Sequence, residues 1–241
     1  MARLDCMSNK TPRIGLLGGS FNPVHIGHLR LCLEMLEQAG LDRVELVPAY
    51  IPPHKDPAGI LPFEMRVRML QSCIEGIGGL KINLMEQDRP GPSYTLDTLK
   101  TYMHANPGHE VNFILGDTDL FTLPKWHHGR DIAYLSNLLV IGREGGQSGV
   151  EAFIREFLRI SRQEGNCWEL ENGRRISFYC VPRLDISSSM IRSRWLDRKS
   201  IDWLVPSRVR DMLESSSGEV RSVWGKNSSQ AARGCKPASC R

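Results

Sequence analysis

The sequence predicts an α/β fold in which a doubly wound parallel sheet forms a single domain. Short apolar runs alternate along the chain with longer segments of helical periodicity, and such repeated strand–helix–strand units imply parallel strands joined by right-handed crossovers. The chain has 241 residues, 41% of them hydrophobic, which is enough for one large core. We expect residues 13–215 to form this domain, preceded by an N-terminal extension at 1–12.

The first strand and helix are the most distinctive part of this pattern. An apolar run at residues 13–17 suits a buried strand, the glycines at 18–19 allow a tight turn, and leucines at helical spacing predict a helix over 25–39 that ends at Gly40. The proline-rich residues 50–62 predict a loop. Further strands are expected at 43–49, 80–85, 110–115, 138–141 and 175–181, and further helices at 64–75, 95–105, 125–135, 150–160, 189–198 and 205–214.

Charge and composition exclude several classes of protein. The formal net charge is +4, but residues 215–241 hold five basic residues against one acidic residue, so the rest of the chain is formally neutral and no nucleic-acid partner is expected. No apolar stretch is long enough to span a membrane, and the N-terminus lacks the apolar core of a secretory signal, so we expect a cytoplasmic protein. Residues 216–241 are predicted to be a disordered basic tail. The cysteines lack metal-ligand spacing and are expected to be reduced thiols at positions 6, 32, 73, 167, 180, 235 and 240.

The turn at residues 18–29 has the features of an anion-binding site. A glycine pair before a helix start directs free backbone N–H groups and the positive end of the helix dipole to one place. His25 and His28 are three residues apart, so they share one face of the helix start. Two solvated histidines, or one end of a metal site, would give the same spacing. The P-loop and dinucleotide-binding glycine motifs are absent.

The segment GGSFNPVHIGH resembles the (T/H)xGH signature of the nucleotidylyltransferase superfamily, in the GGTFDPxHxGH form of nicotinate-nucleotide adenylyltransferases. The resemblance implies a Rossmann-like nucleotidylyltransferase fold, with His25 and His28 as catalytic residues at the phosphates of ATP. Asn22 stands where many members have Asp and is expected at the acceptor substrate. The resemblance further implies that the turn binds ATP through Gly18, Gly19, Ser20 and Phe21.

A second anion site is predicted at residues 186–192, where serines follow a strand and a turn and open a helix. Serine hydroxyls lie beside free N–H groups at such a position, and Arg192 shares a helix face with Ser188 and Ser189. An ordinary capped helix with a surface arginine is the simpler alternative. The segment resembles the ISSTxIR signature of the same superfamily, which implies that Ile186, Ser188 and Ser189 bind ATP and that Arg192 is catalytic.

A third helix start is expected within residues 90–99, which open with two prolines and a glycine. Ser93 or Thr95 could cap this helix, and a second anion-binding helix start is possible. A well-capped helix with Tyr94 in the core is an equal alternative. The run resembles the SYTxxTL element of nicotinate-nucleotide adenylyltransferases, which implies that Tyr94 and Thr95 hold the pyridine ring and its carboxylate.

Two loops resemble further elements of this family. Residues 123–126 resemble the LPxW element, which implies that Trp126 stacks on the pyridine ring; a tryptophan that anchors a helix start would look the same. Residues 52–55 resemble the PPH(K/R) loop, which implies that His54 and Lys55 contact the substrate. A solvated loop charge is the alternative for Lys55.

Asp117 and Asp119 lie where the sequence departs from the family, because Thr118 occupies the position of the usual aspartate. Either neighbour is expected to take over its ribose or metal contact. Arg143 lies at a strand end, the edge where such sheets bind ligands, and resembles the family arginine near the nucleotide phosphates. An exposed surface charge is an equal alternative for Arg143. No role is assigned to the histidines at 104, 109, 127 and 128.

The resemblances together imply adenylyl transfer from ATP, accompanied by Mg²⁺, to nicotinate mononucleotide, which gives deamido-NAD and pyrophosphate. The acceptor phosphate is mostly dianionic at neutral pH because its second pKa is near 6, so it needs no general base. Nicotinamide mononucleotide is the competing acceptor, and a non-catalytic nucleotide sensor of the same fold is the alternative from another class. The expected partners are the two nucleotides alone, with no membrane and with the oligomeric state left open.

Overall fold

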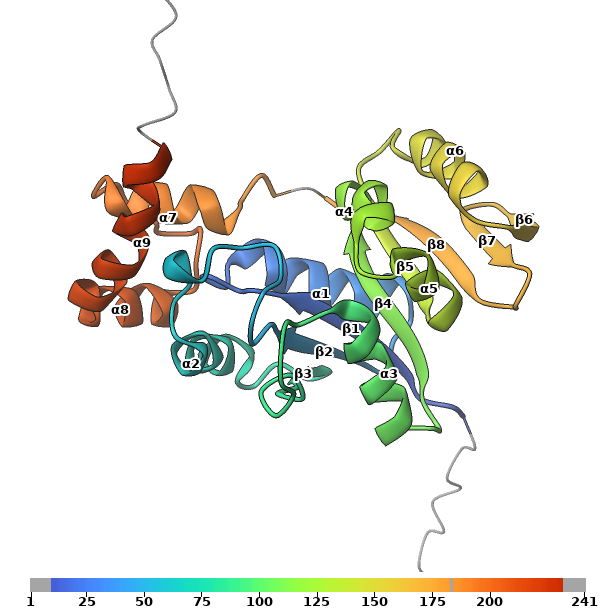
Figure 1. The fold of residues 1–241 in the computed structure, drawn as a ribbon, viewed down its shortest axis with the longest axis horizontal. Coiled ribbons are helices and arrows are strands. Elements are labelled where there is room, and N and C mark those ends of the chain that lie inside the picture. Colours follow the sequence, from blue (N-terminus) through green and yellow to red (C-terminus); the bar gives the residue numbers. More distant parts are fainter. Residues whose placement is uncertain (1–9, 183, 232–241) are drawn as a thin grey trace, which may run out of the picture.

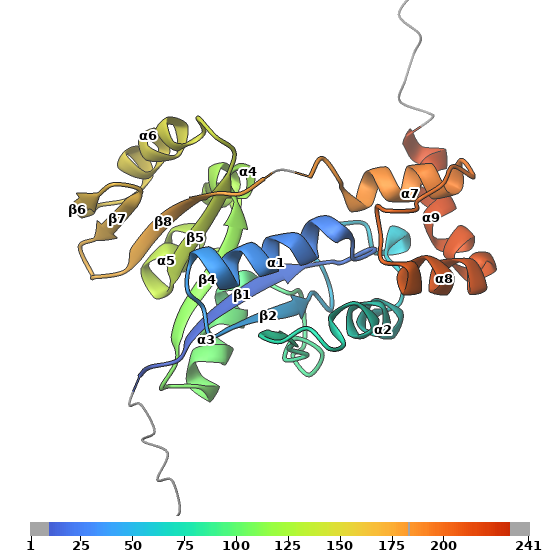
Figure 2. The same ribbon diagram turned by 180° about the vertical axis from the view of Figure 1, so that it is seen from behind.

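The computed structural model describes residues 10–182 and 184–231, which form an eight-stranded sheet with helices on both faces (Figures 1 and 2). The strands are β1 (Arg13–Gly19), β2 (Arg43–Pro48), β3 (Leu80–Ile82), β4 (Glu110–Gly116), β5 (Asn137–Gly142), β6 (Ile160–Glu164), β7 (Cys167–Leu170) and β8 (Arg175–Cys180). Their order in the sheet is β3-β2-β1-β4-β5-β8-β7-β6. The first six strands in this order are parallel, and β7 and β6 are added antiparallel at one edge.

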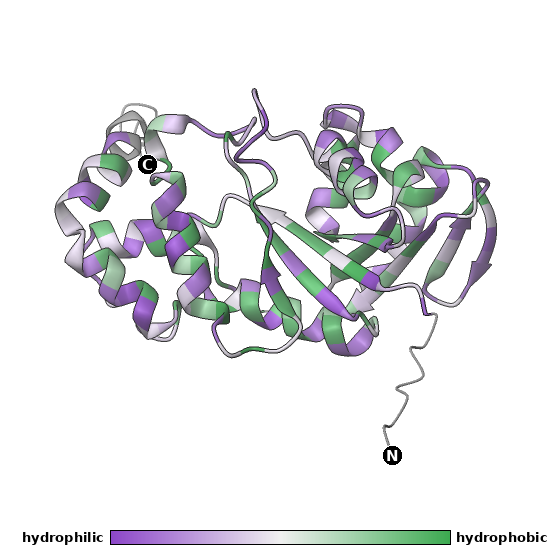
Figure 3. Ribbon diagram, turned by 90° about the horizontal axis from the view of Figure 1, so that it is seen from below, coloured by the Kyte–Doolittle hydropathy of each residue, from purple (hydrophilic) through white to green (hydrophobic). Residues whose placement is uncertain are grey.

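The helices are α1 (Ile26–Gln38), α2 (Phe63–Ile74), α3 (Thr95–Ala105), α4 (Asp117–Thr122), α5 (Gly129–Leu135), α6 (Gln147–Phe157), α7 (Ser188–Leu196), α8 (Ser207–Ser215) and α9 (Ser217–Ala231), with short 3₁₀ turns η1 (Pro57–Gly59) and η2 (Leu123–Lys125). Two hydrophobic clusters cover the two faces of the sheet. One contains residues of α1, α2, α7, α8 and α9, and the other contains residues of α3, α4, α5 and α6. Figure 3 shows hydrophobic residues concentrated along the central strands.

Strand β1 places the predicted turn at the point where the strand order reverses. Its side chains alternate between the two clusters, with Ile14 and Leu16 in one and Leu17 in the other. β1 lies between β2 and β4. The strands that follow it in the chain are therefore added first on one side of β1 (β2 and β3) and then on the other (β4 and β5). Ligands bind in the crevice at the carboxyl ends of the strands at such a point. The glycine turn after Gly19 lies there.

The predicted α/β architecture is confirmed, and two segments differ from the expected elements. The predicted helix at 125–135 is replaced by η2 and the shorter α5, and α4 precedes them. The β6–β7 hairpin was not predicted, because β6 is exposed beyond its first residue and carries no apolar alternation. Gly165, with φ +55°, forms the turn between the two strands. The sheet is therefore mixed at this edge.

The C-terminal segment corrects the expectation of disorder from residue 216. Residues 217–231 form α9, and its Val220 and Trp224 are buried against the same cluster as α1 and α2. Two apolar residues four positions apart place one face of a helix on the core. A pattern of two residues was too short to distinguish a helix from a disordered polar tail in the sequence. Residues 232–241 and 1–9 of the predicted tail and extension lie outside the described residues.

Within the ranges that the structure describes, no helix is both long enough and apolar enough to cross a bilayer. The cysteines at 32, 73, 167 and 180 are free thiols, in agreement with the sequence. Burial raises the pKa of Cys32 and of Cys73 to about 12. These two thiols therefore stay protonated and act as small core residues.

Candidate active site

The backbone between β1 and α1 forms a tight loop that is fixed by buried side chains. Phe21 has a left-handed backbone (φ +44°), and its ring is 1% exposed. A Cβ on Gly19 would lie 3.1 Å from this ring, so the glycine lets the ring fold back beneath the loop. The next peptide bond, between Asn22 and Pro23, is cis. The side chain of Phe21, which we expected at ATP, therefore belongs to the core.

His25 and His28 come together as the sequence predicts. Their rings stack with centroids 3.6 Å apart and planes 25° apart. His28 Nδ1 accepts a hydrogen bond from the His25 backbone N–H (3.2 Å), so a neutral His28 carries its proton on Nε2 and offers it as a donor. Burial lowers the pKa of His25 to about 4. Burial, followed by the charges of His25 and Lys55, holds the pKa of His28 well below its usual 6.5, so both rings are neutral at physiological pH.

The Nδ1 atom of His25 lies at the start of α1, where the side chains of His25 and His28 each face the backbone N–H of the other in a capping-box arrangement. This nitrogen is buried and makes no hydrogen bond of ordinary geometry within the described part of the chain. A Cβ at Gly27 would lie 3.0 Å from this nitrogen, so the glycine of the HIGH sequence leaves the space beside the ring free.

The first turns of α7 are hydrogen-bonded to the backbone between β1 and α1. Arg192 Nη1 donates to the Asn22 carbonyl (2.9 Å), and the Ser188 hydroxyl donates to the Pro23 carbonyl (2.8 Å). Arg192 Nη2 also donates to Ser189 Oγ at 3.2 Å. The two signatures therefore meet, although they lie far apart in the sequence. The hydroxyl of Ser188 must leave Pro23 before it can donate to a phosphate.

Asn22, which we expected at the acceptor substrate, is a structural residue of the turn. It is 2% exposed, and its Nδ2 donates to the Gly59 carbonyl at 2.8 Å. Its Oδ1 accepts from the Leu61 backbone N–H and from Trp224 Nε1, each at 3.2 Å. An aspartate would place a carboxylate oxygen against the Gly59 carbonyl, so this chain needs the amide.

Lys55 and Arg66 add positive charge behind the turn. Lys55 Nζ donates to Ser20 Oγ (2.6 Å), and its pKa is lowered by burial and by Arg192 and Arg66. Arg66 is 1% exposed and donates to the carbonyls of Leu61, Ser20 and Ala49 at 3.0, 2.8 and 2.9 Å. The sequence predicted a helix over 64–75 but no role for Arg66. The missed signal was its spacing from Met69 and Leu70, which puts a cation on the apolar face.

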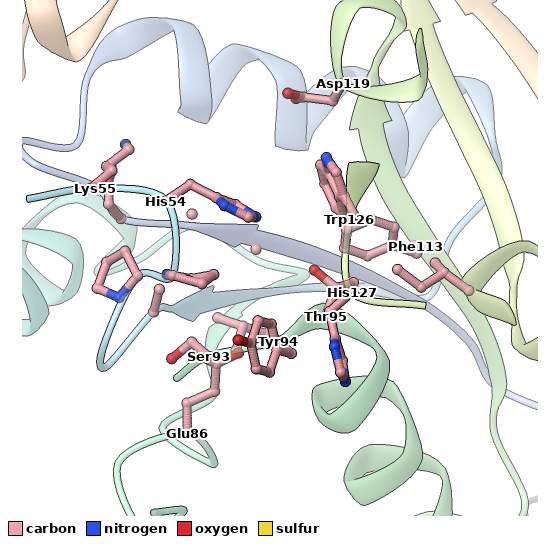
Figure 4. A pocket seen from close by; sticks show the side chains of 18 residues that line it. His54, Lys55, Glu86, Ser93, Tyr94, Thr95, Phe113, Asp119, Trp126 and His127 are labelled. Atoms are coloured by element: carbon pink, nitrogen blue, oxygen red, sulfur yellow. The ribbon is translucent and has the colours of Figure 1, made fainter. Parts of the chain in front are cut away.

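A cavity of about 310 Å³ lies at the carboxyl ends of β1 and β2, and Figure 4 shows its walls. Nine of the predicted site residues line it: Gly18, Gly19, Ser20, His54, Lys55, Tyr94, Thr95, Asp119 and Trp126. Sequence reasoning assigned no role to several further lining residues, among them Glu86, Phe113 and His127. His127 could have been considered, because it follows Trp126 directly in the sequence.

Aromatic rings form one end of this first cavity. Trp126 packs edge-on against Phe113 with centroids 6.4 Å apart, and its indole N–H donates to Thr122 Oγ1 at 3.1 Å. Tyr94 stacks on His127 with centroids 4.2 Å apart. In Figure 4, Trp126 and Phe113 lie across the cavity from His54 and Lys55. The cavity thus has a flat aromatic side and a cationic side.

The start of α3 contributes backbone donors to the same cavity. The N-cap residue is Tyr94, and neither Ser93 nor Thr95 caps the helix as expected. Ser93 Oγ instead accepts from the Ile51 backbone N–H at 3.2 Å. The first-turn N–H groups, beginning with that of Thr95, therefore stay available for an acceptor in the cavity.

We call the segment from Gly18 to His28, which contains both histidines, the histidine turn. A second cavity, of about 340 Å³, lies on its other side. Gly27 and Ile186 line it together with Asp117, Thr118 and Arg143. The two candidate aspartates are therefore divided, with Asp117 at the second cavity and Asp119 at the first. Burial raises the pKa of Asp119, and Lys55 opposes this shift. A Cβ at Gly142 would lie 2.5 Å from the Phe178 ring, so only glycine fits at this wall.

The described residues contain no group of three or more histidine, cysteine or acidic side chains placed to hold a metal ion. Magnesium sites on nucleotides commonly use one or two protein carboxylates and complete the shell with phosphates and water. Asp117 and Asp119, on the first turn of α4, are the acidic residues that fit such a site.

Comparison with known proteins gives consistent matches. The cytidylyltransferase-like family model matches residues 16–194. A Trichlorobacter lovleyi protein named "probable nicotinate-nucleotide adenylyltransferase" is 38% identical over 83% of this chain and 96% of its own. The nicotinate-nucleotide adenylyltransferase of Bacillus subtilis is 32% identical over 85% of this chain and 96% of its own.

The fold is also similar to that of a solved structure. The nicotinic acid mononucleotide adenylyltransferase of Plasmodium falciparum, complexed with NaAD, superposes with a TM-score of 0.68. The match covers 86% of this chain and 97% of that chain at 19% identity, so it supports the fold. The family model and the curated relatives establish the relationship itself: the chain belongs to the nicotinate-nucleotide adenylyltransferase family of cytidylyltransferase-like proteins.

Proposed function

We propose that this protein transfers AMP from ATP to nicotinate mononucleotide, which yields deamido-NAD and pyrophosphate. The observation that carries the proposal is the pair of cavities on the two sides of the histidine turn. Residues of the turn line both, with Gly18, Gly19 and Ser20 at the first cavity and Gly27 at the second. Two nucleotides bound in them would bring their phosphates together at His25 and His28.

The acceptor nucleotide fits the first cavity. The aromatic side, with Trp126, suits a flat pyridine ring, and the cationic side, with Lys55, suits its phosphate. The N–H groups at the start of α3 suit a carboxylate. The ATP adenosine then takes the second cavity, where Asp117 and Arg143 can contact ribose and phosphate.

Catalysis in this proposal consists of positioning and charge stabilisation. An oxygen of the acceptor phosphate attacks the α-phosphorus of ATP, a new P–O bond forms, the bond between the α-phosphorus and the α–β bridging oxygen breaks, and pyrophosphate leaves with that electron pair. His28 donates from Nε2 and Arg192 from its guanidinium to oxygens that gain charge in the transition state. No side chain needs to remove a proton, because the acceptor phosphate is mostly dianionic.

Mg²⁺ fits this site as an ion brought in by ATP. Either Asp119, at the first cavity, or Asp117, at the second, would hold it through a carboxylate oxygen or water, and it would offset the negative charge on the β- and γ-phosphates. Removal of Mg²⁺ with a chelator should abolish pyrophosphate release, and readdition should restore it.

The preferred acceptor follows from the donors in the first cavity. A carboxylate accepts hydrogen bonds from backbone N–H groups such as that of Thr95, whereas an amide nitrogen opposes them with N–H groups of its own. An unpaired buried donor costs about 1–3 kcal/mol. We therefore expect kcat/KM to favour nicotinate over nicotinamide mononucleotide by about 10- to 100-fold.

A substrate panel tests the proposal. Pyrophosphate release is measured with ATP and Mg²⁺ against nicotinate mononucleotide, nicotinamide mononucleotide and phosphopantetheine. Fast release with the first alone supports the proposal, and equal kcat/KM for the two pyridine nucleotides contradicts the carboxylate contact. Binding of ATP with no release for any acceptor would favour the nucleotide-sensor alternative.

A further inference from the structure

Helix α9 contacts the histidine turn, although it lies beyond the residues 16–194 that match the family model. Trp224 on α9 is 1% exposed, and its indole Nε1 donates a hydrogen bond to Asn22 Oδ1 at 3.2 Å. The two residues are separated by 202 positions in the sequence. Figure 1 shows α9 with α7 and α8 at the end of the molecule where β1 ends.

Asn22 is the point where several elements meet. Its side chain joins α9 to the segment around η1, through Gly59 and Leu61. Its own carbonyl accepts from Arg192 Nη1 on α7 at 2.9 Å. A displacement of Asn22 therefore moves the acceptor that orients the Arg192 guanidinium.

The same displacement reaches the histidines along the backbone. Only Pro23 and Val24 separate Asn22 from His25, and the Pro23 carbonyl is held by the Ser188 hydroxyl at 2.8 Å. His25 in turn donates its backbone N–H to His28 Nδ1. The orientation of His28 Nε2 thus depends on Asn22 through the backbone of residues 22–25 and the hydrogen bond from the His25 N–H to His28 Nδ1.

Helix α9 is itself fixed in place. The Trp224 ring packs edge-on against Trp195 of α7, with centroids 5.4 Å apart and planes 89° apart. The Arg221 guanidinium lies 5.1 Å from the centroid of the Trp195 ring. Val220 is fully buried in the cluster that also contains residues of α1 and α2. The indole N–H of Trp224 is therefore presented to Asn22 from a rigid support.

We propose that Trp224 is a positioning residue for adenylyl transfer, and that α9 fixes the orientation of Arg192 and of the histidine pair through Asn22. This inference rests on the proposed function for its kinetic readout. It assigns a role to a segment outside the family-model match, and it makes the hydrogen bond, in addition to the buried ring area, responsible for turnover.

The decisive variant is Trp224→Phe, which keeps a buried ring and removes the N–H donor. Trp168→Phe is the matched control, because it makes the same change in another fully buried indole, which lies in the other hydrophobic cluster and whose Nε1 has no hydrogen-bond partner among the described residues. We expect Trp224→Phe to lower kcat about tenfold, below the roughly 100-fold cost of a 1 Å misplacement. KM for the acceptor should stay within about twofold, and Trp168→Phe should keep kcat within about twofold. Equal kcat for the two variants at equal melting temperature would overturn the proposal.

A second measurement on the unsubstituted full-length protein covers the case in which Trp224→Phe does not fold. Native-state hydrogen exchange should give the Leu61 amide, which donates to Asn22, the same opening free energy as the amides of Val220 and Trp224. A Leu61 amide that stays protected while α9 opens would refute the coupling. A wild-type protein without turnover on any acceptor would contradict the proposed function only, and the exchange result would still decide the role of α9.

Discussion

Replacement of His28 by alanine tests the mechanism most directly. The change removes the Nε2 donor of a half-buried side chain on the turn between β1 and α1, and the loss of one preorganised transition-state donor costs about 10²- to 10³-fold in kcat. The alanine also removes the ring that stacks on His25 and the acceptor for the His25 N–H. We expect kcat for pyrophosphate release, at saturating ATP and nicotinate mononucleotide, to fall by this factor.

Two further variants separate the donor from its structural side effects. His28→Gln restores an acceptor for the His25 N–H, because glutamine at the third helical residue reaches back to the N-cap, and it also offers an amide donor. It should therefore recover part of the lost turnover. His104→Ala changes an exposed histidine at the end of α3 and should leave kcat unchanged. Near-normal turnover of His28→Ala would remove His28 from the mechanism.

Two predictions concern buried cations and histidines. Arg66→Met leaves three buried carbonyls without their donor, so the free energy of unfolding in urea should fall by about 3 kcal/mol or more; an unchanged midpoint would show that the carbonyls find other donors. The pKa of His25 falls from 6.5 to about 4 on folding, so the unfolded chain binds more protons between these values, and stability present above pH 6.5 is lost as the pH falls toward 4. The loss should be about 3 kcal/mol, and His25→Gln should show a correspondingly flatter profile of unfolding free energy against pH.

Much of the fold and of the site is visible in the sequence because local patterns determine it. Two short segments are examples: the strand–glycine–helix unit around Gly18 and the serines before Arg192. In both, the local backbone conformation is determined by adjacent residues. Their meeting follows from parallel topology, since both lie at carboxyl ends of strands. The resemblance to a known family then supplied the first cavity, including Trp126 and Tyr94.

The errors have a common physical origin in contacts between distant segments. Asn22 looked like a substrate contact because its partners, Gly59, Leu61 and Trp224, lie 37 to 202 positions away. Helix α9 looked disordered because, among its residues up to 226, only Val220 and Trp224 are fully buried, and they become buried only when α7 and η1 are in place. Arg66 could have been found, because a cation at an apolar position of a helix predicts a buried polar partner.

Burial is the main reason that the two histidines are neutral, and at His28 the charge of Lys55 adds to its effect. Lys55 and Arg66 already place cations beside the turn, and the pKa of Lys55 is depressed in part by Arg192 and Arg66. Protonated histidines would add to this repulsion, whereas neutral rings donate hydrogen bonds without it. A polyphosphate that binds here is attracted to each of these cations, whereas the cations repel one another. In the proposed reaction, the phosphates would therefore be attracted most strongly to the turn between the two cavities.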